Sequence, residues 1–530
     1  MRHFNFYLSL IFCFISTALW EHCYAQFDHN YAYSTPPNAG RPNVIFIFSD
    51  DHAYQAISAY GSKLAQTPNI DRIAKEGAIF RNSFVTNSIC GPSRATLLTG
   101  KYSHINGYTL NEKVFNTAQQ LFPELLQQNG YQTAWIGKWH LGSLPRGFDY
   151  YNILPGQGHY YNPDFIHTGN DTVTMSGYVT DIITQLSEDW LEKRDKSKPF
   201  FMVVGEKATH REWLPSLQDL GAYDSINFPL PLTFFDDYKG RIAAQNQDMT
   251  IDKTMRLKED LKVHVDYDHT RDYKRMTPEQ RKVFADYYEN KVSRDFDQNH
   301  YTGKDLVRWK YERYLKDYLS VARSLDRNIG KLLDYLDQTG LSKNTVVIYA
   351  SDQGFYLGEH GWFDKRFMYE ESLRTPFLMR YPGVIKPGTA INQFILNIDW
   401  APTILNITGT KVPADIQGAS FLPLLRNGAN SSPWRKEIYY HYYEFPEPHH
   451  VYPHFGIRTE KYKLIRFYGE KNAWELYDLN KDKEEIRNIY GVKGNEKITA
   501  ELKGKLIELI RLYRDEEVLK ILEAEKAQGE

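Results

Sequence analysis

Residues 43–52, NVIFIFSDDH, form a continuous apolar run that stops at two adjacent aspartates, Asp50 and Asp51. A second run of this kind, residues 344–354 (NTVVIYASDQG), stops at Asp352 and Gln353. Short apolar runs without alternation are typical of strands that are buried on both faces of a parallel sheet. Because parallel strands end at the same edge, we expect the two acidic tips to lie close together, although about 300 residues separate them.

Helical patterns lie between these two strands. Residues 67–77 (TPNIDRIAKEG) begin with Thr-Pro and end at a glycine, and residues 302–340 carry apolar side chains at three- and four-residue spacing. The order strand, helix, strand, helix predicts an α/β fold. We expect a large mixed, mostly parallel sheet with helices on both faces, which binds ligands at the carboxyl ends of its strands.

The domain organisation follows from shifts in composition. Residues 236–299 are charged and have little strand character, which predicts an insertion over the main domain, either a lid or a solvated helical hairpin without a role. A cluster of Asn, Gly and Ser ends the main domain, residues 41–427. Residues 428–530 then show alternating strands and a charged helix from about Glu496, which predicts a smaller α+β domain with an antiparallel sheet.

The amino terminus predicts export. Residues 1–25 combine a weakly positive start, a short apolar stretch and Ala25 at a plausible cleavage point, as in a signal peptide, and residues 26–40 are a linker. Cleavage would leave Cys90 as the only cysteine, which cannot form a disulfide within its own chain. We therefore expect a periplasmic or secreted protein whose Cys90 is buried as an apolar residue, paired with another chain or chemically converted.

Composition excludes two classes of partner. The chain has 64 Lys and Arg against 66 Asp and Glu, so no overall positive charge favours nucleic acid. After residue 25, no apolar run approaches the roughly 20 residues that a membrane span needs. We expect the mature protein to bind no nucleic acid, to have no membrane span, and to hold any anionic substrate by a local cluster of cations.

The acidic strand ends raise the question of a metal. Asp50, Asp51 and Asp352 supply carboxylate oxygens and Gln353 an amide oxygen, and such hard donors suit Ca²⁺ better than zinc. The competing interpretation is that two aspartates after a strand cap the next helix.

Residues 88–100, SICGPSRATLLTG, resemble the signature of the type I sulfatases, Cys-x-Pro-Ser-Arg followed by Leu-Thr-Gly. In that family a formylglycine-generating maturation enzyme oxidises the cysteine to formylglycine (3-oxoalanine). Both acidic strands, residues 137–142 (GKWHLG) and residues 475–488 (ELYDLNKDKEEIRN) also resemble family segments. The resemblance implies an alkaline-phosphatase-like fold, a catalytic domain over residues 41–427 and one Ca²⁺ ion.

The resemblance also implies roles for individual residues. As formylglycine, Cys90 would attack the sulfur of a sulfate ester, His140 would act as the base and His210 would protonate the leaving alcohol. Many relatives have Asn or His where this chain has Gln353. The cations around the sulfate would be Arg94, Lys138 and Lys365, and the metal ligands would be Asp50, Asp51, Cys90, Asp352 and Gln353.

Residues 302–319, 358–377 and 454–468 look most like bacterial sulfatases that remove 6-O-sulfate from N-acetylglucosamine in glycosaminoglycans or mucin glycans. This sulfated saccharide is the expected substrate. Asp364 and Arg366 would bind sugar hydroxyls. His450 and His454 would close the pocket, or are surface histidines without a role.

Three alternatives to this substrate and function remain. The chain could act on another sulfated position, on galactose, N-acetylgalactosamine or a uronate. It could be a phosphate or phosphonate monoester hydrolase, because those enzymes share the sheet and a similar metal site. It could also be a secreted sugar-binding protein on an inactive sulfatase scaffold.

Overall fold

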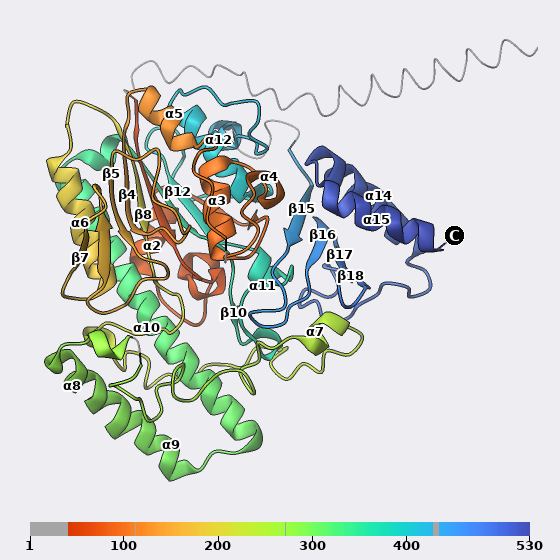
Figure 1. Cartoon of the computed structure of the whole chain (residues 1–530), viewed down its shortest axis with the longest axis horizontal. Helices are drawn as coiled ribbons and strands as arrows, with labels where there is room; N and C mark the ends of the chain where they lie inside the picture. Colours follow the sequence, from red (N-terminus) through yellow and green to blue (C-terminus); the bar gives the residue numbers. More distant parts are fainter. Residues whose placement is uncertain (1–40, 112, 271, 428–433, 530) are drawn as a thin grey trace, which may run out of the picture.

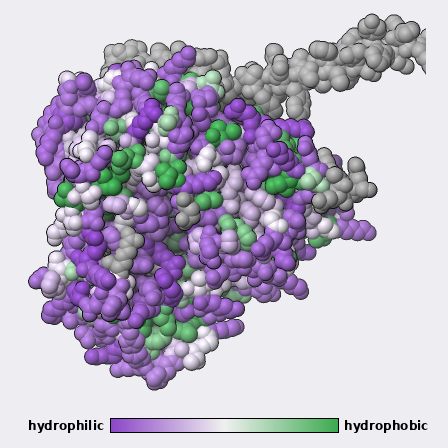
Figure 2. All heavy atoms as spheres, viewed as in Figure 1, coloured by the Kyte–Doolittle hydropathy of each residue, from purple (hydrophilic) through white to green (hydrophobic). Residues whose placement is uncertain are grey.

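The computed structural model describes residues 41–111, 113–270, 272–427 and 434–529. The predicted signal peptide and linker lie outside these residues. Among the described residues, none of the helices combines the length and the apolar composition that crossing a bilayer requires. On the face drawn in Figure 2, hydrophilic residues dominate and apolar residues form small scattered groups.

A ten-stranded mixed sheet forms the centre of the larger part of the chain (Figure 1). Its strands lie in the order β13-β2-β12-β9-β1-β8-β4-β5-β6-β7, and the five from β9 to β5 run parallel. This confirms the predicted large, mostly parallel sheet. The strands are β1 (Asn43–Ser49), β2 (Ala78–Phe80), β4 (Gln132–Lys138), β5 (Tyr150–Leu154), β6 (Asp164–His167), β7 (Thr172–Thr174), β8 (Phe200–Gly205), β9 (Thr345–Ser351), β12 (Phe377–Arg380) and β13 (Thr389–Ile391).

Helices cover both faces of this sheet, as predicted. Side chains alternate along β1, so that Ile45 and Ile47 face one hydrophobic core whereas Phe46 and Phe48 face another. The first core is covered by α2 (Pro68–Lys75), α6 (Val179–Lys193) and α10 (Gly303–Gln338), and the second by α3 (Cys90–Thr99), α5 (Phe122–Gln128) and α12 (Trp400–Ile407).

The expected insertion is packed rather than free. It contains α7 (Ile242–Asn246), α8 (Pro278–Tyr287), a π-helix (Tyr288–Ser293) and α9 (Arg294–Asn299). Two of its polar groups meet a single buried carboxylate of α10: Tyr288 donates to Asp317 Oδ1 at 2.8 Å, and Lys262 Nζ lies 3.1 Å from Oδ2. The insertion therefore forms a layer along the first half of α10, which has 36 residues and is about 54 Å long (Figure 1).

The carboxyl-terminal part has its own four-stranded antiparallel sheet, which confirms the predicted α+β arrangement. Its strands are β15 (Glu437–Tyr442), β16 (His454–Thr459), β17 (Tyr462–Phe467) and β18 (Ala473–Asp478). The terminal helix begins at Glu496 as expected but forms two helices, α14 (Glu496–Leu512) and α15 (Glu516–Gly529). Figure 1 shows this sheet to the right of α3 and α4, on the far side of them from β4 and β5.

Shorter elements connect these layers. The strands among them are β3 (Ser83–Phe84), β10 (Tyr356–Leu357), β11 (Phe363–Asp364) and β14 (Ile395–Leu396). The helices are α4 (Ser103–Asn106), α11 (Glu370–Leu373) and α13 (Leu422–Asn427). Single-turn 3₁₀ helices occupy residues 54–56, 58–60, 217–219, 273–275, 341–344, 359–361 and 397–399.

Candidate active site

The acidic ends of β1 and β9 meet, as the sequence predicts. The two strands are parallel neighbours in register, with Ser49 opposite Ser351. The residues that follow them therefore leave the sheet at the same point. The backbone N–H of Asp51 donates to Asp352 Oδ1 at 3.1 Å, which joins the two strand ends directly.

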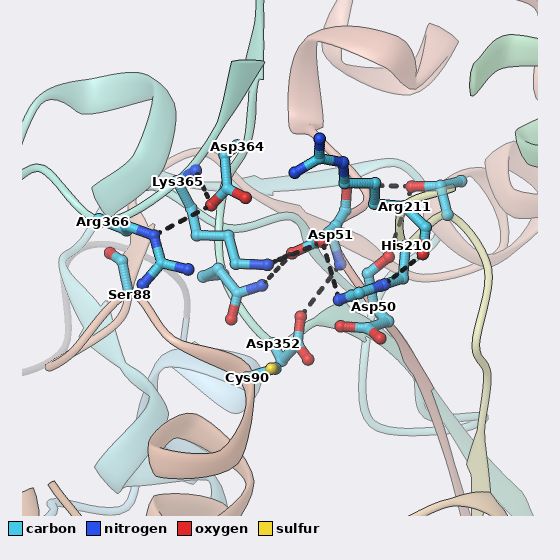
Figure 3. A network of polar contacts seen from close by, with 12 residues as sticks. Asp50, Asp51, Ser88, Cys90, His210, Arg211, Asp352, Asp364, Lys365 and Arg366 are labelled. Carbon is cyan, nitrogen blue, oxygen red and sulfur yellow. Dashed lines mark hydrogen bonds and ion pairs between the residues drawn. The ribbon is translucent and has the colours of Figure 1, made fainter. Parts of the chain in front are cut away.

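Each carboxylate in this cluster pairs with a buried cation. Lys365 Nζ lies 2.9 Å from both oxygens of Asp51, so that its side chain reaches across the site (Figure 3). The two remaining ion pairs are Arg94 with Asp352, at 3.0 Å from Nη2, and Lys138 with Asp50. Arg94, Lys138 and Lys365 come from α3, β4 and the residue after β11, so three distant segments supply the positive charge that was predicted.

In spite of these ion pairs, the charged forms of two of the three carboxylates are disfavoured on balance because of their burial. Burial and the nearby Asp50 raise the pKa of Asp51 to about 6, although Lys365 opposes this. Burial and Asp50 raise the pKa of Asp352 to about 8, against the effect of Arg94. Burial also disfavours the charged form of Asp50, but Lys138 and His210 lower its pKa well below the usual value. Such a group of carboxylates favours a proton or a further cation.

Two oxygen atoms in the cluster are suited to bind that cation. Asp50 Oδ1 and Gln353 Oε1 are buried, and neither has a hydrogen-bond partner among the described residues. The amide nitrogen of Gln353 donates to Asp51, which leaves the carbonyl oxygen free for another contact. Unpartnered buried oxygens are costly, whereas carboxylate and amide oxygens are the ligands that Ca²⁺ prefers. The residues present therefore fit a calcium ion.

Cys90 is the first residue of α3 and is 1% exposed. Its Sγ lies 3.2 Å from His140 Nδ1, so the predicted base contacts the predicted nucleophile. Burial and the charge of Lys138 lower the pKa of His140 well below its usual value, which keeps the imidazole neutral and able to accept a proton.

The predicted proton donor, His210, lies on another side of the acidic cluster (Figure 3). Its Nδ1 is 2.6 Å from the carbonyl oxygen of Arg211, which can only accept, so Nδ1 carries a hydrogen. Nε2 then faces Asp51 Oδ2 at 3.9 Å. The loop that carries His210 is fixed to the insertion, because Arg211 forms a two-pronged ion pair with the buried Asp260.

Several site residues have a left-handed backbone conformation, which side chains other than glycine rarely adopt. The φ angles are 62° for Asp51, 55° for His140, 79° for Asp364, 97° for Arg366 and 75° for His449. Strained residues of this kind persist only where the surrounding structure holds them, and they concentrate at functional sites.

The predicted sugar-binding pair, Asp364 and Arg366, lies beside Lys365 (Figure 3). The Arg366 Nε atom is 3.3 Å from Asp364 Oδ1. Two residues that the sequence analysis did not identify hold this pair: Glu444 forms an ion pair with Arg366, and His449 Nε2 lies 3.2 Å from Asp364 Oδ2. His449 is adjacent to a residue that was predicted, but nothing in the sequence distinguishes Glu444.

The two predicted pocket histidines have different surroundings. His454 is in β16 and is fully buried: Nε2 accepts from the N–H of Met368 at 3.1 Å, and Nδ1 lies 2.8 Å from the carbonyl of Tyr452. The prediction that His454 closes the pocket is therefore wrong, because neither ring nitrogen is available to a ligand. The His450 ring packs against Phe445 and Tyr452.

Asn111 also contacts the nucleophile and was not predicted. Its Nδ2 lies 3.5 Å from Cys90 Sγ, and its Oδ1 accepts a hydrogen bond from the N–H of Gly91 at 3.0 Å. The residue lies in a loop without a motif, so the sequence gives no signal for it.

Comparisons with known proteins agree with this geometry. Residues 42–410 match the sulfatase family, and residues 358–512 match the carboxyl-terminal region of N-sulphoglucosamine sulphohydrolase. The chain is 49% identical over 488 residues to an N-acetylglucosamine-6-O-sulfatase of Bacteroides thetaiotaomicron, covering 90% of this chain and 87% of that protein. It is 26% identical to an ulvan-active sulfatase of Formosa agariphila, covering 90% and 82% of the two chains.

A solved structure shows the same fold. It is a complex with D-glucosamine-2-N,6-O-disulfate, described as the substrate of that protein. It has a TM-score of 0.88 and 48% sequence identity, and the match covers 90% of this chain and 99% of the other. With a family match over most of its length, this chain belongs to the sulfatase family and is a sulfuric ester hydrolase.

Proposed function

We propose that this sulfatase removes 6-O-sulfate from N-acetylglucosamine units of glycosaminoglycans or mucin glycans, with Cys90 converted to formylglycine and one Ca²⁺ ion bound. The observation that carries the chemistry is the position of Cys90. It lies against His140 at the start of α3, in a site where Arg94, Lys138 and Lys365 are all buried. A sulfate ester carries its charge on oxygen atoms, and such preorganised cations stabilise that charge.

The calcium ligands would be the side chains of Asp50, Asp51, Asp352 and Gln353, together with the group at position 90. The unpartnered Asp50 Oδ1 and Gln353 Oε1 support this assignment. When bound, the ion supplies positive charge that polarises the sulfate. Arg94, Lys138 and Lys365 each already neutralise one of the carboxylates, so the added charge of the ion would be available to the anionic sulfate ester.

The proton transfers fall to the two histidines. After conversion, position 90 would supply one hydroxyl that attacks sulfur as the bond from sulfur to the sugar oxygen breaks, and a second hydroxyl that loses its proton as the C–O bond to the sulfate breaks, which releases sulfate and restores the aldehyde. His140 accepts that proton, because its Nδ1 already contacts the side chain at position 90 and its imidazole is neutral. His210 is placed to give a proton to the leaving sugar oxygen through Nε2. Because Nδ1–H is held by the Arg211 carbonyl, this step requires the imidazolium form, which burial and Lys138 disfavour by lowering the pKa of His210 well below its usual value.

The sugar would lie over Asp364 and Arg366. A carboxylate beside a guanidinium offers an acceptor and donors to adjacent hydroxyl groups. The choice of N-acetylglucosamine 6-sulfate is supported by the 49% identity to an N-acetylglucosamine-6-O-sulfatase and by the solved complex with a 6-O-sulfated glucosamine.

The experiment that tests this function is a substrate comparison. The protein is produced with a formylglycine-generating enzyme, and sulfate release is measured from the 6-sulfates of N-acetylglucosamine, N-acetylgalactosamine and galactose, and from a sulfated uronate. We expect N-acetylglucosamine 6-sulfate to give the highest kcat/KM. A higher value for another sugar would overturn the substrate, and faster release of phosphate from an aryl phosphate than of sulfate from the matching aryl sulfate would overturn the reaction.

We further propose that the chain is exported through cleavage after residue 25 and is matured at Cys90. Mass analysis of the protein from its native host tests both points. The expected result is an amino terminus near residue 26 and a peptide containing Cys90 with the mass of the aldehyde. An intact thiol in fully active protein would contradict the mechanism.

A further inference from the structure

The amide of Asn111 lies against the first turn of α3. The N–H of Gly91 donates to Asn111 Oδ1 at 3.0 Å, and Asn111 Nδ2 lies 3.5 Å from Cys90 Sγ. Among the described residues, the polar side chains recorded within hydrogen-bonding distance of this sulfur are those of Asn111 and His140. Asn111 therefore contacts the reacting position directly.

The direction of the amide is fixed by its partner. An N–H group can only donate, so the atom that faces Gly91 must be the oxygen, and the NH₂ group must face position 90. Gly91 permits this approach because a Cβ at that position would lie 2.6 Å from Asn111 Oδ1 and 2.7 Å from the ring of Tyr108. The NH₂ group, at 3.5 Å, is the nearer of the two amide groups to Sγ, because the oxygen lies 3.8 Å from Sγ and already accepts from Gly91.

The loop around Asn111 is held to the sugar-binding side of the site. Its backbone N–H lies 3.5 Å from Glu444 Oε1, and the other carboxylate oxygen of Glu444 pairs with Arg366. The hydroxyl of Tyr108 lies 3.5 Å from the Asn111 carbonyl. These contacts restrain the backbone of Asn111, and the bond from Gly91 restrains its side chain.

We propose that Asn111 is a further catalytic residue, whose amide donates a hydrogen bond to one hydroxyl oxygen of the hydrated formylglycine at position 90. This inference rests on the proposed function. His140 and Asn111 both contact the side chain at position 90, and the hydrate has two hydroxyl groups. Asn111 as a donor holds one oxygen in place, while His140 as an acceptor faces the hydroxyl that loses its proton.

The test compares Asn111→Ala and Asn111→Asp with the parent protein. Asn111→Asp keeps the shape but replaces the donor with a carboxylate, so it also covers the case in which Asn111→Ala misfolds. The matched control is Asn116→Ala, because Asn116 lies in the same loop, is exposed, and accepts hydrogen bonds from the nearby Ala118 and Gln119. Circular dichroism and thermal melting check the fold of each variant.

Peptide mass spectrometry determines the aldehyde content of each preparation. Two quantities are then measured and expressed per mole of aldehyde. The first is the rate at which a small aminooxy compound captures the aldehyde without substrate. The second is kcat for a small aryl sulfate. Loss of the donor should destabilise the hydrate, so we expect capture several-fold faster and kcat about tenfold lower for Asn111→Ala, with a larger fall in kcat for Asn111→Asp. Asn116→Ala should match the parent.

Unchanged capture and unchanged kcat in both Asn111 variants would overturn the inference and leave the proposed function intact. A rise in KM alone would also overturn it, because a group that contacts only the bound substrate would behave in that way. Parent protein that turns over substrate with an intact thiol would overturn the proposed function and, with it, this inference. The aldehyde content of the parent therefore separates the two failures.

Discussion

The two sides of the active site are built differently. The proposed sulfate-binding side comes from the ends of strands in the large sheet, from α3 and, for Lys365, from the residue after β11, and each of its cations is fixed by a buried carboxylate. On the sugar-binding side, Asp364 and Arg366 are held by His449 and Glu444, which follow β15 in the carboxyl-terminal part. In the proposed function, the reaction therefore depends on one part of the chain, whereas sugar recognition depends on the contact between two parts. Substitutions on the first side should impair every sulfate ester, whereas those on the second should impair only sulfated sugars.

The largest effect is expected at the nucleophile. Cys90→Ala should reduce kcat/KM by more than about a thousandfold on both a sulfated sugar and an aryl sulfate, because no other residue can replace the reacting group. The folded state should lose only about 1 kcal/mol, since one buried sulfur is removed. Kinetics on both substrates and a thermal melt check this. Residual activity that is substantial and metal-dependent would show that the sulfate-binding side acts without position 90.

Lys365→Ala should also impair both substrates, by about a hundredfold to a thousandfold. Its ammonium group pairs with Asp51 and would contact the sulfate of any ester, so the loss of charge is independent of the sugar. Lys113→Ala is the control, because Lys113 is exposed and its ammonium group bonds to Thr109. If Lys365→Ala spares the aryl sulfate, this lysine belongs to the sugar-binding side.

Asp364→Ala and Arg366→Ala should separate the two sides. Each lost charged hydrogen bond to the sugar is worth roughly 1.5 to 3 kcal/mol, or about ten- to a hundredfold in kcat/KM on N-acetylglucosamine 6-sulfate. Most activity on the aryl sulfate should remain. Equal losses on both substrates would mean that this pair supports the sulfate-binding cations instead.

A smaller effect of the same kind is expected at His449. His449→Gln weakens one contact to Asp364, so kcat/KM on the sugar should fall about two- to tenfold while the aryl sulfate is unaffected. His450→Gln is the comparison, because the His450 ring packs against Phe445 and Tyr452. A larger loss in His450→Gln than in His449→Gln would restore the sequence prediction for His450.

The smallest effect on activity is expected at Asp515, which forms a second contact between the two parts of the chain through His104. Burial raises the pKa of Asp515, but the hydrogen bond from His441 and the charges of His441 and His104 outweigh it and lower the pKa to about 2. A lowered pKa stabilises the fold above the unfolded value near 3.9, and this contribution is lost as the pH falls toward 2. Asp515→Asn should therefore cost up to about 2 kcal/mol at pH 7 and progressively less below pH 4.

Chemical denaturation of Asp515→Asn and parent protein at pH 7, 4 and 3 measures this difference. Tyr439→Phe removes a second hydrogen bond to the same carboxylate, at 2.8 Å, which also lowers the pKa of Asp515, so its cost should fall with pH in the same direction and be smaller. A difference between Asp515→Asn and parent that stays constant with pH would show that the loss is one of packing rather than of charge.

The positions of the residues on the proposed sulfate-binding side can be predicted from the sequence because most of them directly follow a strand or lie on one helix. The acidic residues directly follow apolar strands, and the register of β1 with β9 brings them together. Cys90 and Arg94 are four residues apart on one helix. Lys138 and His140 lie at the end of another strand, β4. Each of these groups is placed by the secondary structure that precedes it, so a motif and its strand are sufficient.

The sugar-binding side is harder to predict because its supporting residues are placed by tertiary packing. Glu444, His449 and Asn111 lie in irregular segments, and only the folded chain brings them to Arg366, Asp364 and Cys90. The error at His454 has the same cause. Alternation shows that residues 454–459 form a strand, but not that the His454 side chain packs against Phe367 and Phe467 in the core.

The burial of α3 sets an order of events in time. All ten residues of this helix are buried, and Cys90 is 1% exposed. An enzyme that oxidises Cys90 must therefore reach the segment before the helix packs into the fold. Asp515, which contacts His104 shortly after this helix, is synthesised more than 400 residues later than Cys90. If the fold around α3 forms only after the rest of the chain has been synthesised, an enzyme can oxidise Cys90 during that time. A variant that folds its amino-terminal part earlier would leave Cys90 unmodified.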